Sequence, residues 1–198
     1  MANFQQAGEH RSVLLLGHSF VRRFGEYLVS PPHPFRSDLN LPAGVQFYCQ
    51  GVGGRIVPSL IRYDLGAVDS VRPDVIVLEI GSNDLCDPSV SFLTIGSAID
   101  DLCALLMDRF QVRHVVVCQI LRRIVLPYPA FNEQVLLLNN YLEVVIGDRA
   151  HATFWKHRGF WHNTSILFCP DGVHPNYAGL GRLYRSYRGA ILQALPRL

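Results

Sequence analysis

Short apolar runs alternate with stretches of helical spacing along most of the chain. The runs have the length of buried strands, and the stretches between them repeat apolar residues every three or four positions. We expect strands over residues 13–16, 45–49, 75–80, 112–119 and 152–155. We expect helices over residues 20–28, 57–63, 90–110, 132–147 and 176–195.

Two of these runs, 75–80 and 112–118, are almost continuously hydrophobic, which is typical of strands covered on both faces. Because strands and helices alternate, we expect an α/β fold, a three-layer α/β/α sandwich with a mainly parallel sheet of about five strands. Residues 1–11 are expected to form a flexible N-terminal tail. Residues 12–198 are expected to form a single domain, because they contain no repeat and no linker.

Composition narrows the class of protein. The chain is 49% hydrophobic and 17% charged, as in a compact globular protein, and its net charge of +2 is too small to imply nucleic-acid binding. No apolar run approaches the roughly 20 residues of a membrane helix, and residues 1–11 lack the hydrophobic centre of a signal peptide. The five cysteines form no Cys-x-x-Cys pair, which favours free thiols in a cytoplasmic protein over disulfides or a zinc site.

An acid and an imidazole lie three residues apart just ahead of the last predicted helix. At this spacing Asp171 can fold back onto the ring of His174, so that one ring nitrogen keeps its proton and the other is free to accept one. The sequence therefore predicts a general base at His174, which needs a nucleophile to act on.

A serine follows the first predicted strand at a strand-to-helix turn. Open α/β sheets place their chemistry at the carboxyl ends of parallel strands, so Ser19 is the candidate nucleophile. Gly54 and Asn83 stand in turns after the second and third predicted strands and should reach the same edge. The backbone N–H groups of Ser19 and Gly54, together with the side-chain amide of Asn83, could then hold an oxyanion.

These residues resemble the four sequence blocks of the SGNH (GDSL-like) hydrolases, a family of esterases and lipases. The blocks Gly17-x-Ser19, Gly54, Asn83 and Asp171-x-x-His174 occur in the family's order, and the resemblance spans about residues 12–194. It implies a flavodoxin-like fold, a Ser19–His174–Asp171 triad and an oxyanion hole made by Ser19, Gly54 and Asn83.

Three stretches are similar to two particular branches of the family. Gly51-Val52-Gly53-Gly54 is similar to the platelet-activating-factor acetylhydrolases. The Gly-His-Ser-Phe-Val-Arg start and the Asp-x-x-His-Pro-Asn end resemble the esterase domain in the first open reading frame of some non-LTR retrotransposons. A dinucleotide-binding interpretation of the first stretch fails, because Ile56 stands where the third glycine of Gly-x-Gly-x-x-Gly belongs.

One departure from the family pattern concerns the residue before the nucleophile. The family usually has Asp there, and this chain has His18. The substitution leaves the triad intact but changes the charge beside Ser19 and the contacts that hold the turn. Ser19 could also cap the following helix, a role that serine favours and that is compatible with catalysis.

Four arginines leave two interpretations open. Arg22, Arg23, Arg122 and Arg123 could line a basic rim at the active edge of the sheet, or they could be ordinary solvated charges.

We therefore expect a serine esterase that removes small, acetyl-like acyl groups without a cofactor or a metal. Its partner would be a small acyl-ester substrate. Nucleic acid is not expected to bind this domain alone, and self-association stays open. The alternative is a non-catalytic or weakly active binding module of a retroelement ribonucleoprotein, which the departure at His18 and the arginine pairs motivate.

Overall fold

The computed structural model describes residues 10–30, 34–160 and 165–198. Five strands form one sheet in the order β2-β1-β3-β4-β5, and every neighbouring pair is parallel. The strands are β1 (Arg11–Gly17), β2 (Val45–Gly51), β3 (Val75–Glu79), β4 (His114–Cys118) and β5 (Ala152–Trp155). The predicted α/β fold with a five-stranded parallel sheet is confirmed.

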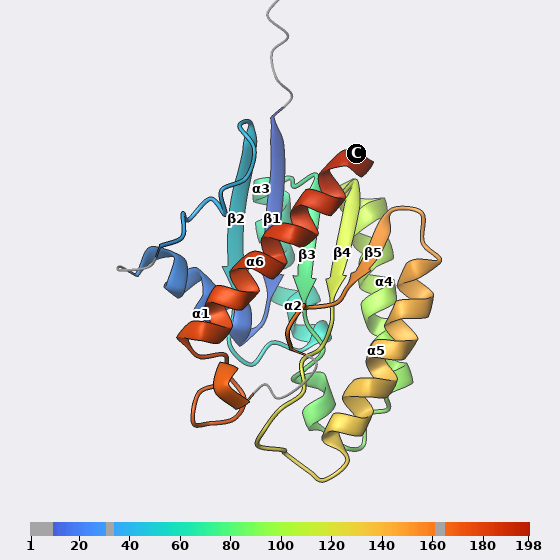
Figure 1. Ribbon diagram of the computed structural model, residues 1–198. Coiled ribbons are helices and arrows are strands. Elements are labelled where there is room, and N and C mark those ends of the chain that lie inside the picture. The colour runs from blue at the N-terminus through green and yellow to red at the C-terminus, as the bar shows by residue number, and fades with distance from the viewer. Residues whose placement is uncertain (1–9, 31–33, 161–164) are drawn as a thin grey trace, which may run out of the picture.

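Helices cover both faces of the sheet (Figure 1). The α-helices are α1 (Ser19–Val29), α2 (Val57–Tyr63), α3 (Leu65–Val71), α4 (Phe92–Phe110), α5 (Phe131–Gly147) and α6 (Tyr177–Ala194). Three 3-10 turns, η1 (Asp84–Cys86), η2 (Ser165–Leu167) and η3 (Leu195–Arg197), complete the described elements. In Figure 1, α6 crosses in front of the strands, and α2 and α3 lie behind them.

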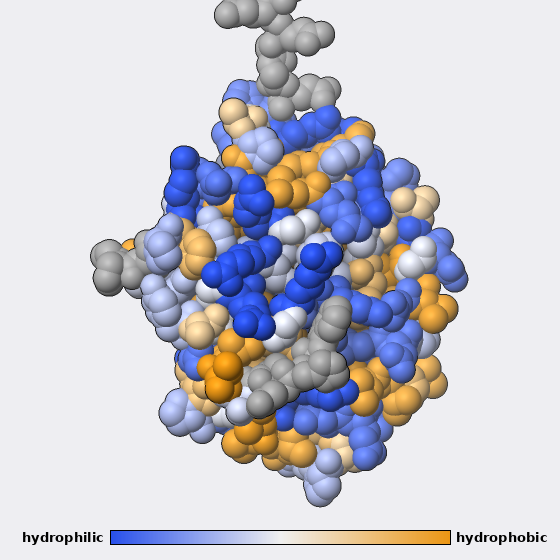
Figure 2. Space-filling view, viewed as in Figure 1, coloured by the Kyte–Doolittle hydropathy of each residue, from blue (hydrophilic) through white to orange (hydrophobic). Residues whose placement is uncertain are grey.

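The side-chain alternation of the strands divides the interior into two cores. Along β1, Leu14 and Leu16 pack in the core shared with α2 to α5, whereas Val13 and Leu15 pack in the core shared with α1 and α6. This is the period of two that a strand imposes on its side chains. Helix α6 buries one face and turns hydrophilic side chains outward, which Figure 2 shows as a blue area over this helix. Among the described residues, no helix has both the length and the apolar character needed to cross a membrane.

The structure differs from the predicted elements at two places. Helix α3 was not predicted; it has only seven residues and follows α2 directly at Asp64. Its apolar residues Leu65, Val68 and Val71 recur every three positions and pack against the core, but the run is too short to stand out in the sequence. Arg11, expected in the tail, is the first residue of β1 and pairs with Val45 of β2. Residues 1–9 of the predicted flexible tail lie outside the described residues.

The strand ends that precede the candidate site lie at one level, because Gly17 pairs with both Gly51 and Glu79. Both glycines allow a close approach of backbone. A Cβ on Gly17 would lie 2.0 Å from the carbonyl oxygen of Glu79, and one on Gly51 would lie 2.2 Å from the backbone nitrogen of Arg22 in α1. A side chain at Gly51 would therefore push the first turn of α1 away from the sheet, and one at Gly17 would collide with the end of β3.

We predict that Gly51→Ala destabilises the protein by about 1–3 kcal/mol, the usual cost of forcing extra volume into a packed site. Gly66→Ala is the matched control, because a Cβ on Gly66 in α3 meets no atom within 4 Å. Alanine there should be neutral or stabilising by up to about 1 kcal/mol. Urea unfolding of the two variants measures the difference, and equal stabilities would contradict the role given to Gly51.

Candidate active site

Ser19, His174 and Asp171 meet at the carboxyl edge of the sheet, although Ser19 and His174 are 155 residues apart in sequence. The Oγ of Ser19 lies 3.1 Å from Nε2 of His174. On the other side of the ring, Nδ1 of His174 lies 2.8 Å from Oδ2 of Asp171. The imidazole is thus oriented by the carboxylate and placed to accept the proton of the serine hydroxyl, which is the geometry of an activated nucleophile.

Asp171 is held by its own loop. The backbone N–H groups of Val173 and His174 each donate to Oδ1 of Asp171 over 2.9 Å. Partial burial acts to raise the pKa of Asp171, but these two N–H donors and the His174 ring outweigh it and lower the pKa to about 2. Asp171 is therefore an anion at any working pH, and it fixes the proton on the Nδ1 side of His174.

The loop itself is anchored at the start of α6. Asn176 is the N-cap of this helix, and its side chain accepts from the backbone N–H of Gly179 over 3.0 Å. The amide group of Asn176 also donates to the carbonyl oxygens of Ile166 and Phe168. The segment that carries His174 is therefore fixed on both sides.

Three candidate hydrogen donors face the same pocket as Ser19. The pocket has a volume of about 340 Å³ and is lined by Ser19, Gly54, Asn83 and His174, among others. The backbone N–H groups of Ser19 and Gly54 have no partner among the described residues, and Gly54 adopts a left-handed φ of 75°. The Asn83 amide donates once, to the carbonyl oxygen of Arg55 over 3.0 Å, which leaves one of its two N–H groups for a ligand.

Gly53 also lines the pocket, so the choice of Gly54 over Gly53 as a donor stays a prediction. The turn that carries both glycines is secured by Arg55, whose guanidinium makes a two-point ion pair with Asp64 at 2.6 and 3.0 Å. Such fork-to-carboxylate contacts fix orientation as well as distance.

The helix-capping role considered for Ser19 belongs instead to His18. His18 is the N-cap of α1, and its Nδ1 accepts from the backbone N–H of Phe20 over 3.3 Å. Among the described residues the Ser19 hydroxyl has a single partner, His174. The capping interpretation of Ser19 was therefore wrong, because the His18 imidazole accepts the hydrogen bond from the helix N–H.

His18 is neutral in the folded protein. It is 2% exposed, and this burial, only partly offset by the negative charge of Glu79, lowers its pKa from 6.5 to about 4. Where the family usually has a negative charge beside the nucleophile, this chain therefore has an uncharged ring.

A negative charge is present one layer deeper, on Glu79 at the end of β3. Its Oε2 accepts from Nε2 of His157 and from the hydroxyl of Tyr187, both over 3.0 Å. His157 in turn contacts the Ser186 hydroxyl through Nδ1 over 2.8 Å, and the indole N–H of Trp155 donates to that hydroxyl. Complete burial acts to raise the pKa of Glu79, but His157 and Tyr187 outweigh it and keep this pKa below its usual value.

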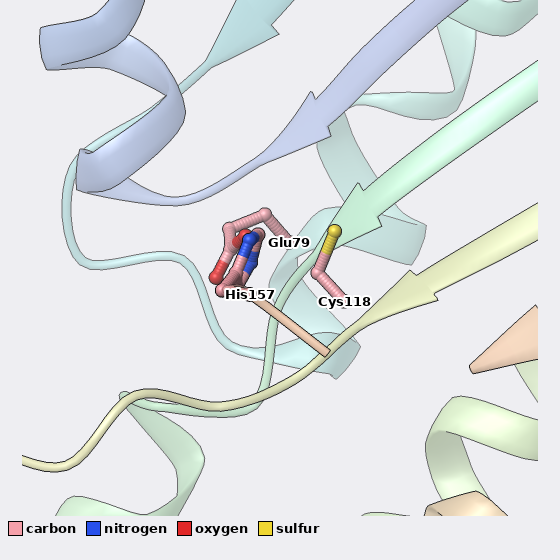
Figure 3. Close-up of side chains that lie close together, drawn as sticks. All are labelled: Glu79, Cys118 and His157. Carbon is pink, nitrogen blue, oxygen red and sulfur yellow. The ribbon is translucent and has the colours of Figure 1, made fainter. Parts of the chain in front are cut away.

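Glu79, Cys118 and His157 also form the one group among the described residues with metal-ligand character (Figure 3). Their ligand atoms lie within 4.8 Å of one another. Glu79 and His157 are already hydrogen-bonded to each other and to their neighbours. Burial raises the pKa of the Cys118 thiol far above its usual value, so the thiol keeps its proton. The chemistry of the set is that of a hydrogen-bond network and fits a metal poorly.

Sequence reasoning did not single out Glu79 or the position of Arg123. The signal for Glu79 was an acid inside an almost continuous apolar run, which is unusual unless the charge is paired. Arg123 is buried at 9% exposure and lines the pocket with Arg22 and Arg23, whereas Arg122 is exposed and lies outside it. The solvated-charge interpretation therefore fits Arg122 but not Arg123.

The solved structures that resemble this chain have the fold described above. No family model matches the chain, and no curated protein matches it. Among solved structures, a GDSL-like lipase from Bacteroides thetaiotaomicron has a TM-score of 0.71 at 17% identity, covering 93% of this chain and 89% of that chain. An α/β hydrolase enzyme from the metagenome of Lake Arreo, Spain, has a TM-score of 0.71 at 17% identity, covering 94% and 97%.

A catalytic mutant of an acetylxylan esterase from Geobacillus stearothermophilus has a TM-score of 0.68 at 15% identity, covering 93% of this chain and 95% of that chain. At these identities the likeness shows the fold, which is that of GDSL-like and related acyl hydrolases. The roles of individual residues rest on the geometry described above.

We predict that His18→Asn removes part of the acid sensitivity of the fold. In the wild type, the unfolded chain binds a proton at His18 near pH 6.5 and the folded chain only near pH 4. Stability is therefore lost as the pH falls between these values, by about 2 kcal/mol at pH 5. The asparagine side chain of the variant could still accept from the helix N–H but does not titrate.

Urea unfolding of both proteins at pH 7 and pH 5 measures this effect. The buried His114, whose pKa burial also lowers to about 4, should retain its contribution in both. His10→Asn, at an exposed position, is the control. An identical loss of stability in the wild type and in His18→Asn would show that His18 is not the group that resists protonation.

Proposed function

We propose that this protein is a serine esterase that hydrolyses small, acetyl-like acyl esters. The observation that carries the proposal is the contact of 3.1 Å between Oγ of Ser19 and Nε2 of His174, with Asp171 held at 2.8 Å on the other ring nitrogen. A hydroxyl, an oriented base and a carboxylate in this order form the constellation that activates serine on several unrelated folds.

In the proposed reaction His174 takes the proton of Ser19 as its oxygen attacks the ester carbonyl. The N–H groups of Ser19 and Gly54 and the Asn83 amide hold the negative oxygen of the tetrahedral intermediate. His174 then gives the proton to the departing alcohol, and water repeats the cycle against the acyl-enzyme. The position of Ser19 in the first turn of α1 adds the positive end of the helix dipole at the oxyanion.

Support for a small acyl group comes from the dimensions of the site. The pocket of about 340 Å³ is at the lower end of the range for small-molecule sites. Structures of the same fold include an acetyl esterase with an acetate ion and an acetyl-xylooligosaccharide esterase, with TM-scores of 0.68 and 0.69. The similarity to the retrotransposon esterase domain stays a prediction from the two end motifs.

The alternative, a binding module without turnover, has less support. A module that had lost catalysis would not need an anionic carboxylate behind an imidazole that is itself in contact with a serine hydroxyl. His18, which motivated that alternative, is accounted for as a neutral helix cap.

We predict that Ser19→Ala abolishes hydrolysis of para-nitrophenyl acetate and labelling by a fluorophosphonate probe, because both need the activated hydroxyl. Asn83→Ala should lower kcat by about 100- to 1,000-fold, the usual cost of losing one oxyanion donor, and should retain labelling. Ser70→Ala is the matched control, because Ser70 is an exposed serine of α3 that bonds only within its helix. If Ser19→Ala kept wild-type turnover, the proposed function would be wrong.

A further inference from the structure

Of the residues that the structure describes, three arginines and no carboxylate line the pocket at Ser19. The arginines are Arg22, Arg23 and Arg123, and the remaining lining is neutral or aromatic apart from the base His174. Asp171 is screened from the pocket by the His174 ring with which it is paired. Before the reaction begins, an uncharged ester would offer no negative charge to pair with these arginines.

Arg123 is the most constrained of the three. The Asn132 side chain in α5 contacts both backbone groups of Arg123, accepting from its N–H over 3.0 Å and donating to its carbonyl oxygen over 2.9 Å. The preceding Ile120 is held in the same way by Asn139, with both contacts at 2.9 Å. These hydrogen bonds fix the backbone of the segment after β4 and therefore the position of Arg123.

The guanidinium of Arg123 is buried without an acidic partner. Its Nη2 donates to the carbonyl oxygen and the hydroxyl of Ser82, both over 3.0 Å, and lies 3.4 Å from Oδ1 of Asn83. The group also lies over the Phe131 ring, 4.8 Å from its centroid. Its Nε is buried with no partner, and Arg123 makes no ion pair with any described residue.

Burying a charge without a counter-charge is expensive, so proteins rarely do it without a use for the group. The acid in this region, Glu79, is already occupied by His157 and Tyr187. The negative charge that complements Arg123 is therefore missing from the described protein and has to come with the ligand.

Arg23 and Arg22 extend the positive lining toward the mouth of the pocket. The Nε of Arg23 is likewise buried with no partner. Arg22 is more exposed and pairs with Glu26 in the next turn of α1. Arg123 and Arg23 are thus the two arginines of the pocket whose Nε is buried without a partner among the described residues.

We propose that Arg123, assisted by Arg23, forms an anion subsite beside the nucleophile, and that the substrate is an ester carrying a carboxylate or phosphate group close to the scissile bond. This inference rests on the proposed esterase function and specifies its substrate class. The anion would accept N–H bonds from the guanidinium groups, which recognise both carboxylate and phosphate oxygens.

Matched ester pairs test the subsite. For an anion on the alcohol side, meta-acetoxybenzoate is compared with the neutral meta-acetoxybenzamide, and meta-acetoxyphenyl phosphate with its dimethyl ester. For an anion on the acyl side, the para-nitrophenyl monoester of adipic acid is compared with that of its monoamide. The quantity measured is the ratio of kcat/KM between the anionic and the neutral member of each pair.

We predict that the wild type prefers the anionic member of at least one pair by about 10- to 100-fold, as a hydrogen bond to a charged group allows. Arg123→Met should bring that ratio close to one, Arg123→Lys should retain part of it, and Arg23→Met should reduce it. Arg122→Met is the matched control, because this neighbouring arginine is exposed and lies outside the pocket; it should leave the ratio unchanged.

Two results would overturn the subsite: a wild-type ratio near one in every pair, or a ratio that Arg123→Met does not alter. The second would mean that Arg123 only positions Asn83, because a damaged oxyanion hole slows both members of a pair equally. Calorimetric binding of both members of each pair to Ser19→Ala gives a readout without turnover. Loss of the anion preference in Ser19→Ala/Arg123→Met supports the subsite even if the esterase proposal fails, and equal affinities of Ser19→Ala for the two members of every pair refute it.

Discussion

The close contact between the end of β1 and its two neighbouring strands governs the rest of the site. Because Gly17 pairs with Gly51 and Glu79, the chain leaves three strands at the same level. The absence of side chains at the two glycines then lets the first turn of α1 settle against the sheet. Ser19 gains its place from this packing, and the turns that hold Gly54 and Asn83 reach the same pocket for the same reason.

The side chains beside and beneath Ser19 place no negative charge next to its hydroxyl. His18 stays neutral because it is buried, and the negative charge on Glu79 beneath it is stabilised by hydrogen bonds from His157 and Tyr187. Without a negative charge next to the serine, the oxyanion donors would face no competing anion from the protein. His18 thus leaves the turn uncharged while its ring accepts a hydrogen bond from the start of α1.

Each loop that follows one of the strands β1 to β4 contributes a different kind of group to the site. The loop after β1 carries the proposed nucleophile, those after β2 and β3 carry the proposed neutral donors, and the segment after β4 carries the buried Arg123. The base His174 arrives from outside the sheet, on a loop held by Asn176 at the start of α6. Neutral and positive groups therefore surround the place where negative charge would develop, and the one nearby carboxylate, Asp171, is kept behind the base.

Local pattern indicated the alternation of strands and helices and the pairing of Asp171 with His174, because each depends on neighbours in sequence. The alternation in turn indicated the parallel sheet, although its strands pair residues far apart in the chain. Local pattern also brought Ser19, Gly54 and Asn83 to one edge, since parallel strands share their carboxyl ends. It could not show that His18 rather than Ser19 caps α1, that Glu79 is paired, or that Arg123 is buried. The His18 cap is a local contact with Phe20, but local pattern does not show which of two adjacent side chains makes it. The pairing of Glu79 and the burial of Arg123 depend on partners distant in the chain, His157 and Ser82, which only the packed fold brings within hydrogen-bonding distance.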